Sequence, residues 1–432
     1  MAPDSGGAIS TPPPARGLKL YDAQTIRHVP QVRRALSEEA LFDLEVVSAV
    51  LPFRTNTYVV DELIDWDAVP EDPIFRLTFA QRGMLAGGVH AAIAALIREG
   101  APAGRVRVAA REAREELNPH PGGQTTVNVP SLEGDPLPGV QHKYRETCLV
   151  FPGHGQTCHA YCAYCFRWPQ FVGEPDLRIA TSEATRFAEY LRAHPEVTDV
   201  LVTGGDPLIM SASVLARYVE PLLDARVEHV QSIRIGTKAL SYWPYRFVSD
   251  GDADDLLRLF ERVTESGKHL AVMAHFSHPR ELETAIAQEA IARVRSAGAE
   301  IRTQSPIVRG VNDAPGTWAR MWAQQVRLGC IPYYMFIARE TGANGFFAVP
   351  LAEATETFAA AYRQVSGLAR TVRGPCMATD EGKVVIEGDA RVAGKRVFVL
   401  SFIQARDPER CRRPFFARHD PSATWFDQLE PA

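Results

Sequence analysis

The stretch HGQTCHAYCAYCFRW, residues 154–168, holds three cysteines, Cys158, Cys162 and Cys165, in the spacing Cys-x3-Cys-x2-Cys. Three thiolates on one short loop can surround one metal centre. A structural zinc ion takes four ligands, so it would need His154 or His159 beside the cysteines. A [4Fe–4S] cluster held by three cysteines keeps one iron open, and an open iron is a site for chemistry. The spacing therefore favours a catalytic iron–sulfur centre over zinc.

The whole chain sets wider limits. Its 432 residues predict two or three domains, or one large α/β barrel with extensions. Seven cysteines are too few for a disulfide scaffold of this length. The formal net charge of −5 gives no basic field for nucleic acid or an anionic membrane. The sequence lacks a bilayer-spanning apolar run and a secretory signal pattern. We therefore expect a cytoplasmic protein with neither a nucleic-acid nor a membrane partner.

Short apolar segments alternate with longer amphipathic ones after residue 146. They predict six strand–helix units, and thus a parallel sheet. The pattern fits a doubly wound sheet and an open barrel equally, because both bury their strands on two faces. The cysteine loop follows the first strand, at the edge where such sheets bind ligands. The strands are expected at 147–151, 199–205, 232–237, 270–276, 300–306 and 331–336, and the helices at 182–194, 211–225, 253–266, 281–297, 315–328 and 351–365.

The remaining segments flank this series. Helical periodicity at 36–50 and 79–117 predicts a helical N-terminal region, which could supply the subunit interface of a homo-oligomer. KVVIEG (383–388) and RVFVLSF (396–402) predict a β-hairpin, with the aromatic tail packed on the domain surface. The expected parts are a disordered tail (1–17), the N-terminal helical region with its linker (18–140), the strand–helix core (141–370) and a C-terminal extension (371–432).

The cysteine stretch resembles the signature of the radical SAM superfamily, Cys-x3-Cys-x-aromatic-Cys, with Tyr164 in the aromatic position. The resemblance implies an α/β fold, an open (β/α)6 partial TIM barrel with an N-terminal helical region and a C-terminal β-hairpin extension. It also implies a [4Fe–4S] cluster on Cys158, Cys162 and Cys165, with S-adenosylmethionine (SAM) on the open iron. One electron, from an external donor of the flavodoxin or ferredoxin type, cleaves SAM. The 5′-deoxyadenosyl radical then abstracts a hydrogen from the substrate.

A second motif, LVTGGDPL (201–208), ends the second predicted strand. Glycines let backbone approach a ligand closely, and a carboxylate can accept a hydrogen bond from an ammonium. Tight turns after strands use the same residues, so the motif alone is a weak signal. After the cysteine loop it resembles the Gly-Gly-Glu-type motif that holds the amino group of SAM. The resemblance implies that Thr203, Gly204, Gly205 and Asp206 contact this cofactor.

Longer segments resemble the lysine 2,3-aminomutase family, from about residue 140 to about residue 380 and more weakly over 51–73. The resemblance implies that His275 and Gln304 contact SAM. It implies that Arg167 binds the substrate carboxylate, which a forked donor suits well. Without it, His275 is an ordinary histidine at a strand end. The matching pieces include His142-Lys143-Tyr144, SIRIGT (232–237), HFSHPRE (275–281), TQSPIVRGVND (303–313) and PYYMF (332–336).

That family also uses pyridoxal phosphate (PLP), and this sequence departs from its pattern in three places. Of the two basic phosphate positions, the first is Lys143 but the second is Thr147. The glycine-rich loop of the PLP lysine is missing, so Lys383, within DEGKVVIEG (380–388), is either the PLP anchor or a plain surface lysine. The acid that would hold the ammonium of lysine is replaced by Arg339. A cation there repels lysine and favours an anionic group.

Three functions are consistent with the sequence. The first is a PLP-dependent amino acid 2,3-aminomutase whose substrate is not lysine. The second is a PLP-independent radical SAM enzyme that catalyses another rearrangement, a dehydrogenation or an epimerisation. The third is a metal-binding protein without catalysis, against which the intact cysteine and Gly-Gly-Asp motifs argue. We predict an aminomutase-like radical SAM enzyme that abstracts hydrogen from a small carboxylate-bearing substrate of the amino-acid type, bound by Arg167 and Arg339, with PLP use left open.

Overall fold

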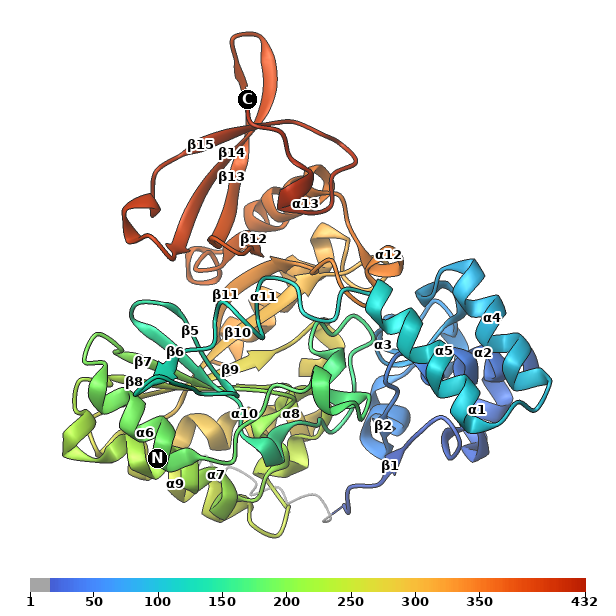
Figure 1. Ribbon diagram of the computed structural model, residues 1–432, viewed down its shortest axis with the longest axis horizontal. Helices are drawn as coiled ribbons and strands as arrows, with labels where there is room; N and C mark the ends of the chain where they lie inside the picture. The colour runs from blue at the N-terminus through green and yellow to red at the C-terminus, as the bar shows by residue number, and fades with distance from the viewer. Residues whose placement is uncertain (1–15) are drawn as a thin grey trace, which may run out of the picture.

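A sheet of eleven strands runs through the computed structural model, which describes residues 16–432. Figure 1 shows this sheet running from its green strands to its red C-terminal strands, with the blue N-terminal helices to one side. The seven strands β6 to β12 pair in parallel with their neighbours, and the other strands pair antiparallel. The fold is therefore mixed α/β with one large sheet. The tail predicted over 1–17 lies outside the described residues, except for Arg16 and Gly17.

The order of the strands decides between the two predicted arrangements. Along the sheet they follow one another in chain order, from β5 at one edge to β15 at the other. A doubly wound sheet reverses its order at a switch point, and none is present among the described strands. The strands are β5 (Val140–Tyr144), β6 (Thr147–Val150), β7 (Asp199–Val202), β8 (Ser232–Thr237), β9 (His269–His275), β10 (Glu300–Ile307), β11 (Ile331–Ile337), β12 (Arg373–Ala378), β13 (Gly382–Val392), β14 (Lys395–Ala405) and β15 (Phe415–Arg418).

Each of the six predicted strands is present within a few residues of its expected bounds, but β12 was missed. Its sequence begins Arg373-Gly374-Pro375, and glycine and proline disfavour strands when read locally. The strand forms because it pairs in parallel with β11 and buries Cys376 and Met377. Tertiary pairing therefore overrides local propensity here.

Helices connect the parallel strands and cover one face of the sheet. Two of them begin with side-chain caps, since the hydroxyls of Ser211 and Thr284 accept from backbone N–H groups in the first turn. The predicted helices are confirmed, although α7 ends earlier than predicted because a 310 turn, Glu220–Leu223, follows it directly. The connecting helices are α6 (Ala184–Ala193), α7 (Ala212–Val219), α8 (Ala239–Tyr242), α9 (Ala253–Glu265), α10 (Ala285–Ser296), α11 (Pro315–Arg327), α12 (Asn344–Phe347) and α13 (Leu351–Arg363).

The two faces of the sheet differ in character. On β8, Ile233 and Ile235 are fully buried beneath the helices. Arg234 and Gly236 alternate with them and are only half-buried on the opposite face. This alternation gives the sheet an apolar, helix-covered side and a polar side that is partly open.

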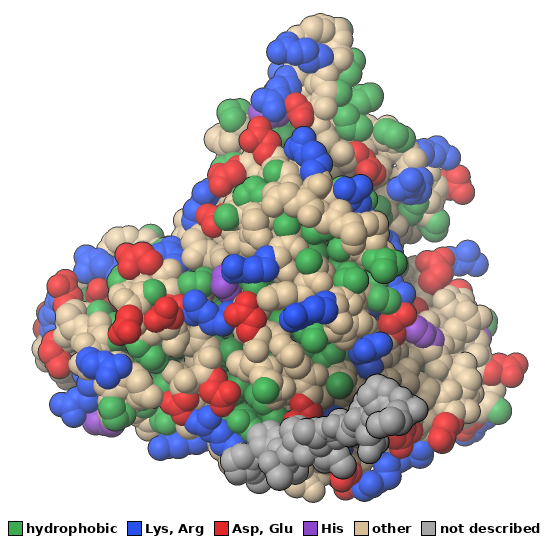
Figure 2. Space-filling model, turned by 180° about the vertical axis from the view of Figure 1, so that it is seen from behind, with side chains coloured by type: hydrophobic (Ala, Val, Ile, Leu, Met, Phe, Trp, Pro, Cys, Tyr) green, Lys and Arg blue, Asp and Glu red, His purple; other side chains and the backbone are tan. Residues whose placement is uncertain are grey.

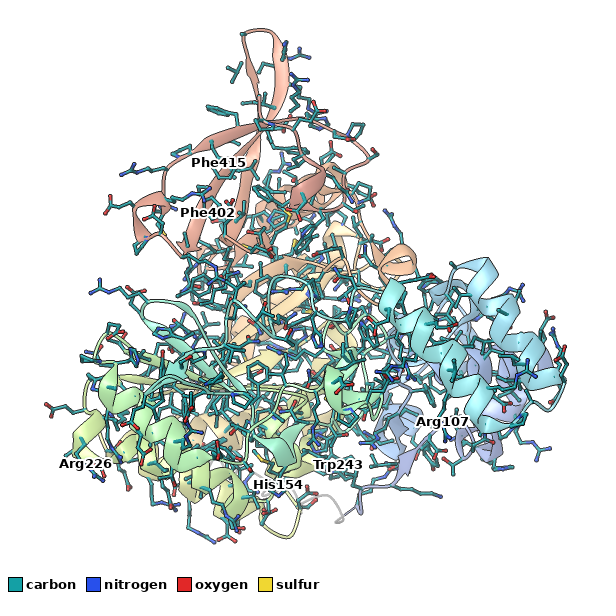
Figure 3. All side chains as sticks on the ribbon, viewed as in Figure 1. Arg107, His154, Arg226, Trp243, Phe402 and Phe415 are labelled. Atoms are coloured by element: carbon teal, nitrogen blue, oxygen red, sulfur yellow. The ribbon has the colours of Figure 1, made fainter. Side chains whose placement is uncertain are left out.

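The N-terminal helices form a second hydrophobic core, which reaches the cysteine loop. Ala160 and Trp168 from that loop belong to this core, together with Trp243 from the connection after β8. Figure 3 labels Trp243 where the N-terminal part meets the sheet region. The elements are β1 (Leu20–Tyr21), α1 (Pro30–Ala35), α2 (Glu38–Val50), β2 (Thr55–Asn56), α3 (Pro73–Thr78), α4 (Gly87–Arg98) and α5 (Ala103–Glu116).

The C-terminal residues extend the large sheet. The predicted hairpin is present as β13 and β14, which pair antiparallel. The aromatic tail adds β15 to them, and Phe415 stacks on Phe402 with ring centres 5.4 Å apart (Figure 3). Trp425 is buried in the same core. The tail therefore packs on the sheet, as predicted.

The charged side chains on the surface are of both signs. Figure 2 shows acidic and basic side chains interspersed over the face in view. Within residues 16–432, no helix has the length and apolarity needed to cross a membrane.

Candidate active site

The cysteine loop lies between β6 and α6, at the carboxyl edge of the sheet. Its three cysteines are half-buried free thiols. Burial raises the pKa of Cys165 to about 12, and the neighbouring Cys162 adds to the rise. Burial, Asp206 and both other cysteines raise the pKa of Cys158 as well. The three thiols share one loop within a span of eight residues, and a bound cation would remove their protons. The donor set therefore fits an iron–sulfur cluster.

The zinc alternative has no matching arrangement. His154 is exposed in a turn before the cysteines, and Figure 3 labels it near the base of the view. His159 is buried. Over residues 16–432, no group of three or more His, Cys, Asp or Glu side chains is close enough to hold a single ion. A four-iron cluster spreads its cysteines more widely, because each binds a different iron.

The segment before α3 holds the loop in place through residues whose role was not predicted from the sequence. The side-chain amide of Asn56 donates to the carbonyls of His159 and Tyr242, each at 2.9 Å. The guanidinium of Arg54 bonds the hydroxyl of Thr157. Asn56 is 0% exposed, so its hydrogen bonds are shielded from water. The signal was a run of polar residues, RTNT (54–57), within an apolar stretch.

The Gly-Gly turn after β7 packs directly on the loop before Cys158. A Cβ added to Gly205 would overlap the backbone of Thr157. Gly204 has a φ of 150°, and a Cβ there would overlap the side-chain amide of Gln156. The close approach of two backbone segments therefore requires a glycine at 205, and the positive φ favours a glycine at 204. Their predicted contacts to SAM, and that of Thr203 at the end of the same strand, stay predictions.

Asp206 is tied into the fold at the same turn. Its carboxylate accepts hydrogen bonds from the Thr237 hydroxyl at 2.7 Å, the Leu208 N–H at 3.0 Å and the Lys238 N–H at 2.8 Å. Both oxygens take part, and the residue is 2% exposed. Asp206 thus joins the ends of β7 and β8. Its predicted contact to the amino group of SAM stays a prediction.

Tyr164 connects the cysteine loop to the end of β9. Its hydroxyl lies 3.2 Å from His275 Nδ1 and 2.9 Å from Ser277 Oγ. Burial lowers the pKa of His275 to about 3, and the charge of Lys238 adds to this. The imidazole is therefore neutral at neutral pH. Gln304 pairs with His275 on the adjacent strand, so both side chains lie on the same face of the sheet. The structure thus brings two predicted SAM residues and the aromatic residue of the cysteine signature together.

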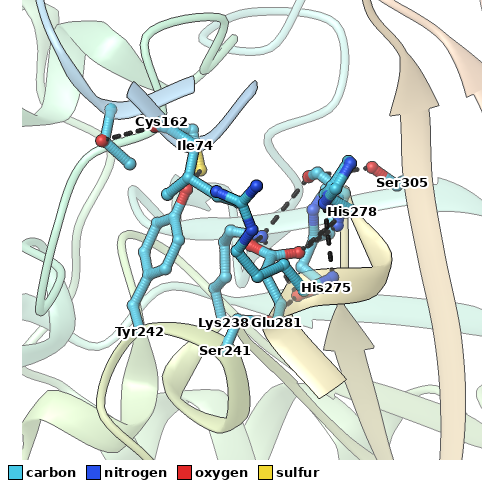
Figure 4. Close-up of polar contacts among 12 residues, drawn as sticks. Ile74, Cys162, Lys238, Ser241, Tyr242, His275, His278, Glu281 and Ser305 are labelled. Atoms are coloured by element: carbon cyan, nitrogen blue, oxygen red, sulfur yellow. Dashed lines mark hydrogen bonds and ion pairs between the residues drawn. The ribbon is translucent and has the colours of Figure 1, made fainter. Parts of the chain in front are cut away.

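A buried ion pair lies beneath the loop and was not predicted. Lys238 Nζ donates to Glu281 Oε1 at 2.7 Å and to the carbonyl of His275 at 3.2 Å (Figure 4). The ammonium also lies 4.5 Å from the centre of the Tyr242 ring. The Tyr242 hydroxyl is 3.5 Å from Cys162 Sγ. Local sequence could not reveal this pair, because its members follow different strands.

The two predicted substrate arginines meet at one aromatic ring. The guanidinium carbons of Arg167 and Arg339 lie 4.9 and 4.8 Å from the centre of Phe166. Burial lowers the pKa of Arg167 to about 10, and the charge of Arg339 adds to this. Nη1 of Arg167 is buried without a hydrogen-bond partner. Burial raises the pKa of Glu340, so its carboxyl balances Arg339 less than an exposed glutamate would. Desolvated cations with an unused donor are suited to an anion.

The residues do not fit the family's phosphate site for PLP. At the first basic position, Lys143 Nζ donates to the carbonyl of Thr379, and burial lowers its pKa to about 7. At the second position, the Thr147 hydroxyl donates to the Asp199 carboxylate at 3.0 Å. Asp199 also pairs with Arg234. A phosphate at this position would meet a carboxylate, which repels it.

Lys383 lies on the polar face of the sheet. The alternative that it is a plain surface lysine does not fit its surroundings. Its Nζ is 3.1 Å from Gln404 Oε1 and 4.4 Å from the centre of the Tyr334 ring. Burial lowers its pKa to about 8. The groups that act on it most, Cys376 and Arg234, belong to β12 and β8. Its described contacts are therefore with the strands and not with the Arg167–Arg339 pair.

The sequence is similar to proteins named as lysine 2,3-aminomutases. No protein-family model matches the sequence. A protein of Aquifex aeolicus, provisionally named an L-lysine 2,3-aminomutase, is 32% identical over 409 residues, which cover 94% of both chains. The L-lysine 2,3-aminomutase of Acetoanaerobium sticklandii is 28% identical over 57% of this chain and 55% of its own length. The L-lysine 2,3-aminomutase of Clostridium subterminale is 27% identical over 56% of this chain and 53% of its own length.

Among solved structures, a radical SAM methyltransferase from Sphaerobacter thermophilus matches 66% of this chain and 93% of its own. The identity is 14% and the TM-score is 0.34, which is too low to define a fold. The alignment with the Aquifex protein is the informative one, because it covers nearly all of both chains at 32% identity. The chain belongs to the lysine 2,3-aminomutase-like family of the radical SAM superfamily.

Proposed function

We propose that the protein is a radical SAM enzyme, aminomutase-like, that acts on a small carboxylate-bearing substrate of the amino-acid type. One observation carries the proposal: three free cysteines share one loop at the carboxyl edge of the sheet, and Arg167, two residues after Cys165, has a buried Nη1 without a hydrogen-bond partner. Family membership implies a [4Fe–4S] cluster and SAM. Cys158, Cys162 and Cys165 would hold the cluster, and the cluster together with SAM would supply hydrogen abstraction from an unactivated C–H bond.

The protein's own residues orient this chemistry. The Tyr164 hydroxyl fixes the neutral His275 ring beside Gln304, and these are the side chains we assign to SAM. Thr203, Gly204 and Gly205 line the neighbouring turn, and Asp206 fixes that turn to β8. We interpret the parallel strands as an open (β/α)6 barrel, whose polar interior would hold the substrate.

The substrate is assigned by charge. Arg167 would bind a carboxylate through its forked donors. Arg339 shares the Phe166 ring with it and would bind a second anionic group, so an acidic amino acid such as glutamate fits better than lysine. Lysine would place its ammonium near Arg339, where two cations repel each other.

A second candidate is PLP-independent chemistry on the same scaffold: another rearrangement, a dehydrogenation or an epimerisation. The contact between Thr147 and Asp199 favours it, because a carboxylate occupies the place of a phosphate-binding cation. On this reading Lys383 is held by Gln404 and Tyr334 as a structural cation. We place the enzyme in the cytoplasm, with an external electron donor of the flavodoxin or ferredoxin type.

Anaerobic reconstitution with iron and sulfide, followed by an absorbance spectrum, tests the proposal. We expect an iron–sulfur spectrum and, after reduction with SAM present, release of 5′-deoxyadenosine. A matched variant, Cys162→Ala, should lose both signals, whereas Cys411→Ala, at a cysteine remote from the loop, should keep them. Reconstituted wild-type protein that takes up no cluster, or that never cleaves SAM, would refute the proposed function. A PLP band abolished by Lys383→Met would favour the aminomutase over the second candidate.

A further inference from the structure

The buried ion pair of Lys238 and Glu281 beneath the cysteine loop takes no part in the proposed binding of SAM or substrate. Glu281 is 0% exposed and Lys238 is 8% exposed. The ammonium has three acceptors within reach: Glu281 Oε1 at 2.7 Å, the His275 carbonyl at 3.2 Å and Ser277 Oγ at 3.4 Å. All three N–H donors of the lysine can therefore be used at once. The charge is fixed in position.

Glu281 is fixed in turn by the backbone. It lies in a short 310 turn, Pro279–Leu282, and its Oε2 accepts from the N–H groups of Ser277 and His278 (Figure 4). The carboxylate therefore cannot rotate away from Lys238 without losing hydrogen bonds to buried donors. The pair joins the end of β8 to the segment after β9.

Stability does not account for the pair. Moving two charges out of water costs several kcal/mol per ion, roughly, and well-packed apolar replacements are often neutral or stabilising. Single removal of one partner is costly, since it leaves the other charge buried and alone. Ion pairs in such places are explained better by what their charge acts upon.

The nearest group of chemical interest is Cys162. The Lys238 ammonium lies 4.5 Å from the Tyr242 ring centre, and the Cys162 thiol donates to the Tyr242 hydroxyl at 3.5 Å (Figure 4). Once the thiol has lost its proton, that hydroxyl can donate to the sulfur. Of the two charges, the ammonium is the one that contacts the Tyr242 ring, whereas the Glu281 carboxylate also accepts from two backbone N–H groups. The pair therefore presents its positive end to Tyr242 and, through the Tyr242 hydroxyl, to this sulfur.

We propose that Lys238 is a positioning residue for the iron–sulfur centre: fixed by Glu281, its ammonium holds Tyr242 against Cys162 and raises the reduction potential of the cluster. A fixed positive charge stabilises a centre that gains an electron. Hydrogen bonds to cluster sulfurs and the net local charge are among the factors that set such potentials. The inference rests on the proposed function, because it needs the cluster at these cysteines.

The test measures the potential directly, by electron paramagnetic resonance during redox titration of the reconstituted protein without SAM. The main variant is Lys238→Met with Glu281→Gln, which removes both charges and leaves neither alone. Lys238→Arg retains the positive charge. Lys268→Met is the matched control, because Lys268 bonds the carbonyls of Val227 and Val230 away from the loop. Iron and sulfide content are determined for every sample.

We expect the double variant to be harder to reduce than the wild type, with Lys238→Arg and Lys268→Met close to the wild type. A cluster-loaded double variant with the wild-type potential would overturn the inference while leaving the proposed function intact. Wild-type protein that binds no cluster would overturn both. If the double variant misfolds, Tyr242→Phe, which keeps the ring and removes the hydroxyl, should shift the potential in the same direction, and an unchanged potential there would also refute the role.

Discussion

Arg167 and Arg339 come from loops after different strands, yet their guanidinium groups lie within 4.9 and 4.8 Å of the centre of one ring, Phe166. Two cations this close repel each other. Their charges are desolvated, since burial lowers the pKa of both side chains. An anionic ligand would relieve that repulsion, and this relationship gives the first prediction.

Arg339→Ala should lower kcat/KM for an acidic substrate by about 10- to 100-fold, because a hydrogen bond to a charged group contributes about 1.5–3 kcal/mol. L-glutamate is the first probe, with products followed by mass spectrometry. Arg339→Lys should retain part of the activity, and Arg107→Ala, at an exposed arginine on α5, should retain all of it (Figure 3). Equal kcat/KM values for Arg339→Ala and the wild type would exclude Arg339 from substrate binding.

Gly205→Ala should destabilise the protein by about 1–3 kcal/mol, since the added methyl group overlaps the Thr157 backbone and overpacking has costs of this size. Urea unfolding followed by circular dichroism measures the change. Gly88→Ala on α4 is the control, because nothing lies within 4 Å of its added Cβ. That variant should be neutral or slightly more stable. A Gly205→Ala protein as stable as the wild type would mean that the two loops can separate at little cost.

Asn56→Ala should remove hydrogen bonds that hold the cysteine loop in place. The change leaves the buried carbonyls of His159 and Tyr242 without their donor, which costs roughly 1–3 kcal/mol. We expect a lower free energy of unfolding and less iron bound after reconstitution. Gln24→Ala, at an exposed amide in the N-terminal part, should change neither quantity. Full iron loading of the Asn56 variant would show that the loop keeps its shape without this support.

Lys143 makes stability depend on pH in a defined direction. Its pKa is about 7 in the folded protein, because of burial and of Arg339 and Arg406, against 10.5 for an ordinary lysine. Between these values the unfolded chain binds more protons, so raising the pH from 7 towards 10 should stabilise the folded state. Urea titrations at pH 7 and pH 9 should show a larger gain for the wild type than for Lys143→Met. Lys395→Met, at an exposed lysine, should keep the wild-type gain; loss of the gain there instead would contradict the assignment.

Purified, reconstituted protein should show iron–sulfur absorbance without a PLP band, and borohydride should leave its SAM cleavage unchanged. The reason is the carboxylate of Asp199 at the second phosphate position. The spectrum is recorded before and after addition of PLP. A band that appears on addition and disappears in Lys383→Met would contradict this prediction and support the aminomutase.

The sequence was most informative where chemistry or periodicity is local. The apolar runs at 199–205 and 270–276 predicted β7 and β9, because a buried strand must be apolar whatever its partner. The spacing of Cys158, Cys162 and Cys165 indicated their common site. Both signals lie within a few residues of chain.

Long-range partners could not be predicted in this way. Asn56 bonds a carbonyl 103 residues away, and Lys238 pairs with Glu281 across 43 residues. Neither residue has a local pattern that names its partner. The strand β12 was missed for a related reason, since its Gly374-Pro375 pair disfavours a strand until β11 is present beside it. The place of Lys383 on the polar face likewise follows from the pairing of β13, not from its neighbours in sequence.

The support of the cysteine loop from both directions along the chain has a consequence for biogenesis. Arg54 and Asn56 are synthesised before the cysteines, whereas Glu281 emerges from the ribosome more than a hundred residues after them. Translation proceeds from the N-terminus, and a nascent chain folds the parts it already contains. The loop can take its final shape only when β9 and the turn after it have been made. Iron is therefore expected to be inserted into a nearly finished polypeptide, and a ribosome-stalled fragment ending before residue 280 should be a poor acceptor.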